Sequence, residues 1–84
     1  MYIVVQHTIS DPAKFWEVAK QAQLPEEVKL HSTFPNTDGS KAVCLWEAKN
    51  LETVKNLLEE AVGQVSTNDY FEVETQNAIG LPNK

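Results

Sequence analysis

Two histidines and a single cysteine are the residues of this chain that could do acid–base or metal chemistry. His7 stands in an apolar N-terminal segment, while His31 and Cys44 stand on either side of a turn. A histidine titrates near neutral pH, so it can act as a general base or bind a transition metal. A cysteine thiolate is a nucleophile and a soft metal ligand. His31 is therefore a candidate base, and the three residues together are a candidate metal site.

Each of these residues also has a structural interpretation. A histidine in a strand can half-fill an interface while it hydrogen-bonds to the main chain. A cysteine in the middle of a strand often packs as a small hydrophobic residue. Two histidines are few for a histidine-rich metal site, and the three glycines are isolated and form no phosphate-binding loop. We therefore expect no cofactor. Trp46 and Tyr70 could contact a small ligand or could fill an interface.

Composition limits the classes of partner. The chain has 84 residues and a formal net charge of −5, which argues against nucleic acid and against an anionic membrane surface. Its apolar stretches are far shorter than the roughly 20 residues of a membrane helix. One cysteine allows no internal disulfide, so the cytoplasm is the expected location. A domain of this size commonly gains stability by self-association, which favours a homo-oligomer.

Cap and turn residues delimit the first elements that must position these side chains. Residues 2–9 are rich in β-branched side chains, which predicts a strand. Asp11 and Pro12 then predict the start of a helix, with Asp11 as its N-cap. Pro25 ends that helix at or before Leu24.

A hairpin and a second helix follow. Residues 28–34 and 41–47 alternate apolar and polar side chains, which predicts two antiparallel strands joined by the turn residues 35–39. Asn50 is the expected N-cap of a helix whose apolar positions, three and four residues apart, run to Val62. The other face of that helix is expected to be solvated and carries Glu52, Lys55, Glu59 and Glu60.

A last strand over residues 70–75 completes the order β-α-β-β-α-β. Right-handed crossovers place both helices on one face of a four-stranded antiparallel sheet, which is the ferredoxin-like α+β arrangement. Residues 1–76 are expected to form this one domain. Residues 77–84 are expected to form a short C-terminal tail, in which Ile79 and Leu81 are apolar.

The sheet face turned away from the helices is the main clue to function. Pairing the hairpin strands across the turn sets His31 opposite Cys44 and Lys29 opposite Trp46. The face away from the helices is then expected to carry His31, Thr33, Ala42, Cys44, Trp46 and Tyr70. The face toward the helices is expected to carry Leu30, Phe34, Val43, Leu45, Phe71 and Val73. A register shifted by one residue would exchange the two sets. Because the first set is too apolar for water, we expect it to be covered by a second copy or to line a pocket.

The segment from His31 to Ala48, followed by the helix after Asn50, resembles the dimeric α/β-barrel superfamily. The resemblance extends over about residues 1–75 in element order. Within that superfamily the chain is similar to small bacterial domain families of unknown function, near a group that includes a nickel-binding protein. That group has a strand end much like Cys44-Leu45-Trp46-Glu47-Ala48. The superfamily includes monooxygenases, haem-degrading enzymes and ligand-binding domains, so the resemblance implies a dimeric fold and no single activity.

The sequence thus predicts a small cytoplasmic homodimer that binds a small molecule in a cavity between sheet faces. His31, Cys44, Trp46 and Tyr70 are expected to line the cavity, with His7 contributing from the first strand. A second hypothesis is a cofactor-independent monooxygenase- or isomerase-like enzyme that acts on a small aromatic or carbonyl compound, with His31 as the base. A third is weak binding of a transition metal such as nickel by His7, His31 and Cys44.

Overall fold

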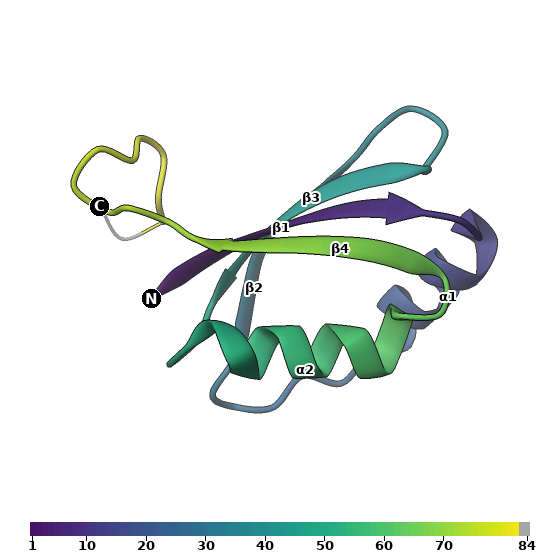
Figure 1. Ribbon diagram of the computed structural model, residues 1–84, viewed down its shortest axis with the longest axis horizontal. Coiled ribbons are helices and arrows are strands. Elements are labelled where there is room, and N and C mark those ends of the chain that lie inside the picture. Colours follow the sequence, from purple (N-terminus) through teal and green to yellow (C-terminus); the bar gives the residue numbers. More distant parts are fainter. Residues whose placement is uncertain (83–84) are drawn as a thin grey trace.

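The computed structural model describes residues 1–82 and contains the six elements in the predicted order. Its strands are β1 (Tyr2–Ile9), β2 (Lys29–Pro35), β3 (Lys41–Glu47) and β4 (Ser66–Glu72). They form one antiparallel sheet in the order β2-β3-β1-β4 (Figure 1). This is the ferredoxin-like α+β topology that the sequence predicts.

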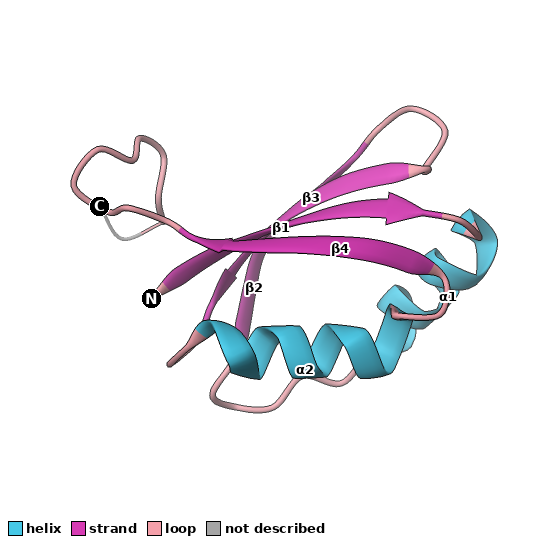
Figure 2. Ribbon diagram, in the orientation of Figure 1, coloured by secondary structure: helices cyan, strands magenta, loops and turns pink. Residues whose placement is uncertain are grey.

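Both helices begin at the predicted cap residues and lie on the same side of the sheet (Figure 2). In α1 (Pro12–Gln21) the Asp11 carboxylate accepts a backbone N–H of the first turn at 3.2 Å. In α2 (Leu51–Val62) the Asn50 side chain accepts the equivalent N–H at 2.9 Å. α2 runs alongside β4, so the two helices cover one face of the sheet and leave the other face open.

The covered face of the sheet carries the hydrophobic core. In the two central strands Ile3 pairs with Trp46 and Val5 pairs with Cys44, so these four side chains share a face. All four are buried, as is Ala42. The helices pack against them with Phe15, Val54, Leu58 and Val62.

The predicted assignment of the two faces is wrong. Cys44 and Trp46 lie beneath the helices, whereas Phe34, Val43 and Phe71 lie on the open face and are 68%, 41% and 48% exposed. Most members of each predicted set still share a face, but it is the opposite face to the one predicted. Thr33, Ala42, Cys44, Trp46 and Tyr70 take the helix side.

The alternation of β1 explains why the faces exchange. β3 is apolar on both faces, so its own pattern favours neither of them. In β1 the polar residues Gln6 and Thr8 alternate with buried Val5 and Ile9. Because β1 lies between β3 and β4, its preference decides which face of the whole sheet is covered.

The predicted hairpin register is also wrong, because the structure has a β-bulge at His31. Leu30 pairs with Trp46 and Thr33 pairs with Cys44, with a shift in register between Leu30 and Ser32. A bulge inserts one extra residue into a strand and re-aims the side chains beside it. His31 is therefore not opposite Cys44, and Lys29 is opposite Glu47 rather than Trp46.

The last strand begins earlier than predicted and ends earlier. It spans Ser66–Glu72 instead of 70–75, because residues with turn-like side chains pair with β1 along its whole length. After β4 the Val73 N–H still donates to the Tyr2 carbonyl at 2.8 Å. In the predicted tail Ile79 is fully exposed, and residues 83–84 lie outside the described part of the chain.

Candidate functional site

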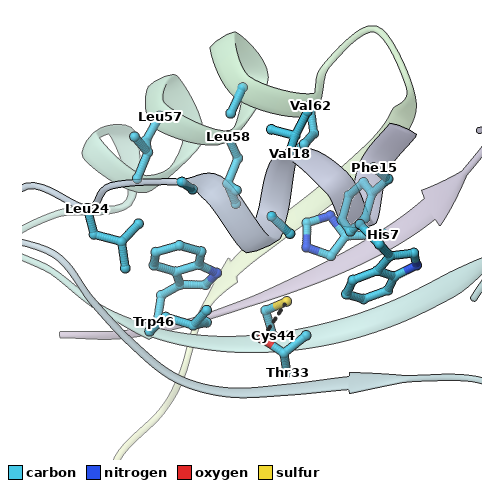
Figure 3. A pocket seen from close by; sticks show the side chains of 15 residues that line it. His7, Phe15, Val18, Leu24, Thr33, Cys44, Trp46, Leu57, Leu58 and Val62 are labelled. Atoms are coloured by element: carbon cyan, nitrogen blue, oxygen red, sulfur yellow. Dashed lines mark hydrogen bonds between the residues drawn. The ribbon is translucent and has the colours of Figure 1, made fainter. Parts of the chain in front are cut away.

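A mainly apolar cavity of about 120 Å³ lies between the helices and the covered face of the sheet (Figure 3). Three of the five predicted ligand-binding residues line it, namely His7 from β1 with Cys44 and Trp46 from β3. α1 and α2 close the opposite side with aliphatic and aromatic side chains that include Phe15 and Leu57. His7, Cys44 and Trp46 come together because they face the same way in adjacent strands.

The indole of Trp46 lines this cavity and carries a buried, unpaired donor. Trp46 is only 4% exposed, and its Nε1–H has no hydrogen-bond partner in the described chain. A buried donor without a partner costs about 1–3 kcal/mol. Figure 3 shows the nitrogen-bearing edge of the indole on the side of Cys44. By contrast, Trp16 donates its Nε1–H to the Gly39 carbonyl at 3.1 Å.

Cys44 is a packed thiol and not an activated nucleophile. Its Sγ donates to Thr33 Oγ1 at 3.6 Å, across the pair of strands that the structure sets side by side. Burial raises the pKa of the Cys44 thiol, and the bond to Thr33 opposes this effect only in part. The thiol is therefore neutral at pH 7, which supports the interpretation of Cys44 as a small hydrophobic residue.

A chain of hydrogen bonds connects His7 to the surface. His7 Nδ1 lies 2.5 Å from Asn68 Oδ1, and its ring packs edge-on against Phe15 with 5.1 Å between centroids. Asn68 Nδ2 donates to Glu59 Oε2 at 2.8 Å. The Tyr70 hydroxyl donates to the same carboxylate oxygen at 2.5 Å. β1, β4 and α2 thus meet in one polar network beside the apolar cavity.

The electrostatics of this network follow from burial and hydrogen bonding. Burial lowers the pKa of His7, which outweighs the opposing effects of Asn68 and Glu59. Hydrogen bonds from Tyr70 and Asn68 lower the pKa of Glu59. Burial and the neighbouring carboxylate raise the pKa of Tyr70. At pH 7 the network therefore contains a neutral imidazole, a carboxylate and a neutral phenol.

The neutral state of His7 gives a testable pH dependence. Because its pKa is below the ordinary value of 6.5, the unfolded chain takes up this proton first as the pH falls. The contribution of His7 to stability is complete above that value and is lost as the pH falls through the folded pKa. We expect the free energy of unfolding, measured with urea at about pH 7.5 and about pH 5.5, to fall more in the wild type than in His7→Gln.

The comparison with His7→Gln isolates the imidazole, because glutamine can still donate to Asn68 and does not titrate. The lowered pKa of Glu59 acts in a window below 4.5, so it does not enter this pH range. An equal fall in both proteins would contradict a buried neutral imidazole.

His31 is separated from the cavity. Its Nε2 lies 2.8 Å from Glu47 Oε1, and its ring lies 5.7 Å from that of Tyr2. His31 does not line the cavity that holds His7 and Cys44. Within residues 1–82, no three His, Cys, Asp or Glu side chains are grouped so that they could hold a metal ion. The predicted metal triad is therefore not assembled, and His31 is not placed to act as a base in this cavity.

Glu59 is the residue of the site that the sequence assigns to another role. It is predicted on the solvated face of α2, and its side chain is exposed, but it accepts hydrogen bonds from two β4 side chains. The signal lies in the spacing, because Glu59 stands three residues before Val62 and so borders the apolar stripe of the helix. Tyr70, predicted to line a cavity, instead binds Glu59 beside the cavity.

Comparison with protein-family models, with curated proteins and with solved structures finds no match for this chain. Among the described residues, neither helix has the length and apolarity that crossing a membrane requires. The site is therefore judged on its own geometry.

Proposed function

We propose that this protein binds a small, largely apolar molecule in the cavity between the helices and the sheet, and that the molecule accepts a hydrogen bond from Trp46. The unpaired Trp46 Nε1–H carries the proposal, because a donor buried without a partner is costly and rare in native proteins. An acceptor on a bound molecule would remove that cost.

The lining of the cavity supports an organic ligand over ordered water. A buried water needs about two to four polar partners, and most of this lining is aliphatic or aromatic. Ligand sites are typically apolar with a few polar groups that fix the orientation of the bound molecule. Trp46 and His7 are such groups in this cavity. The favoured ligand is thus a compound of about the size of a substituted benzene ring, with a carbonyl or similar acceptor.

The two indole N–H groups give a direct test of binding. We expect titration with acetophenone to shift the Trp46 Nε1–H signal in a two-dimensional ¹H–¹⁵N spectrum. The Trp16 ring also lines the cavity, but its N–H is already bonded to Gly39, so the Trp16 signal should shift less than that of Trp46. Cumene, which has a similar shape and no carbonyl oxygen, should bind about tenfold more weakly, as expected for one buried hydrogen bond. If acetophenone moves neither signal, the proposed function is wrong.

Filling the cavity provides a matched control. Ala19 lines the cavity from α1, and Ala13 lies on the same helix outside it. Ala19 is exposed at the edge of the cavity, so Ala19→Leu adds three carbon atoms there and should weaken the acetophenone shift. Ala13→Leu should leave that shift unchanged.

We also propose that the protein is a cytoplasmic homodimer that associates through the open sheet face. Exposed Phe34, Val43 and Phe71 support this, because such a face is unfavourable in water. One face of a flat sheet with four strands of about seven residues has an area of roughly 450 Å², without the surface that the side chains add. That area approaches the roughly 600 Å² per partner of the smaller stable interfaces. A reducing compartment fits the free, buried thiol of Cys44.

A further inference from the structure

We infer that the bound molecule also donates a hydrogen bond to His7, so that the cavity selects small hydroxy-carbonyl compounds with an acceptor for Trp46 and a donor for His7. The inference rests on the proposed binding function and names the ligand class of that site. It follows from the direction of the hydrogen bonds that link His7 to Glu59 through Asn68, and from the placement of the His7 and Trp46 rings on the same cavity.

The Glu59 carboxylate fixes the orientation of the Asn68 amide. An ionised carboxylate only accepts hydrogen bonds, so the amide atom 2.8 Å from Glu59 Oε2 must be the Nδ2 donor. The lowered pKa of Glu59 keeps that carboxylate ionised at neutral pH. The amide oxygen of Asn68 is thereby turned toward His7 and toward Ser66, whose hydroxyl lies 2.9 Å from it.

The orientation of Asn68 in turn fixes the tautomer of His7. An amide oxygen only accepts, so the 2.5 Å contact with His7 Nδ1 requires a proton on that nitrogen. Burial keeps the imidazole neutral, which leaves Nε2 without a proton and with a free lone pair. Among residues 1–82 no group donates a hydrogen bond to this nitrogen.

The two rings therefore offer a bound molecule one hydrogen-bond donor and one hydrogen-bond acceptor. Trp46 has an unpaired donor, the hydrogen bond of His7 is made by Nδ1 and not by Nε2, and both side chains line the same cavity. Figure 3 shows the indole and the imidazole on opposite sides of that space, with Cys44 between them on the sheet. Phe15 packs against His7 and holds the ring in place. A flat molecule with its acceptor and its hydroxyl at opposite ends satisfies both groups.

Four acetophenone-related probes test this pairing. 4-Hydroxyacetophenone has both groups, and 4-methylacetophenone has the same shape with a methyl group in place of the hydroxyl. Acetophenone and cumene complete the set. At pH 7 we expect the hydroxy compound to bind about tenfold more tightly than the methyl compound, as for one buried hydrogen bond. In His7→Phe this difference should disappear.

The outcomes separate the two proposals. If acetophenone binds and the hydroxyl gives no gain over the methyl group, the inference is overturned and the binding function stands. If none of the probes binds, both are wrong. The ¹⁵N shifts of the His7 ring provide a second measurement in the unliganded wild type, which does not depend on the folding of any variant. We expect a protonated Nδ1 and a bare Nε2, and the opposite tautomer would overturn the inference by itself.

Discussion

Trp46→Ala is expected to lower the free energy of unfolding by about 3–5 kcal/mol, the range for deleting a large buried aromatic side chain. The indole lies at the centre of the covered face, paired with Ile3 in β1 and Leu30 in β2. Its removal joins a new void to an existing cavity, and the surrounding structure relaxes only in part to fill it. Urea unfolding followed by circular dichroism measures the change. The total free energy of unfolding of a small domain is about 5–15 kcal/mol, so this effect is large.

Trp46→Phe separates the bulk of the side chain from its polar atom. Phenylalanine retains an aromatic ring in the core and removes the unpaired N–H, so the loss in stability should be much smaller than in Trp46→Ala. The preference for acetophenone over cumene should also disappear. A Trp46→Ala protein that unfolds at the same urea concentration as the wild type would contradict the burial of this side chain beneath the helices.

The elements of this fold are predictable because local residues mark their ends. Asp11 and Asn50 cap the two helices as expected, and Asp38 accepts the Ser40 N–H in the predicted turn. Gly39 in that turn has a φ of 77°, a conformation that glycine adopts without steric cost. Each of these signals depends on contacts within a few residues of the chain, so the sequence alone contains it.

The faces of the sheet depend on contacts between distant residues, and there the sequence was misleading. β3 could bury either of its faces, and only its pairing with β1 decides between them. A one-residue bulge then shifts the register so that His31 is not opposite Cys44. The local sequence pattern does not predict this bulge. Cys44, Trp46 and His7 could still be chosen as site residues from their types and strand positions. The role of Glu59 required the docking of α2 on β4.

Val43→Asp is expected to convert the proposed dimer into a monomer, with a loss of affinity of at least about 100-fold. Val43 lies on the open face in a central strand, where it pairs with Gln6 on one side and Phe34 on the other. In a two-fold symmetric interface each substitution enters twice, so two carboxylates would be buried in one apolar contact. Sedimentation equilibrium over micromolar concentrations measures the change in association.

The control for this substitution must add the same charge at a place that the dimer does not cover. Asn56→Asp does so, because Asn56 is exposed on α2, on the opposite side of the sheet from Val43. It should associate as the wild type does. A wild-type protein that stays monomeric would contradict the dimer proposal. A Val43→Asp protein that dimerises as tightly as the wild type would move the interface to another surface. Neither result would affect ligand binding, because the cavity lies on the covered side of the sheet within one copy of the chain.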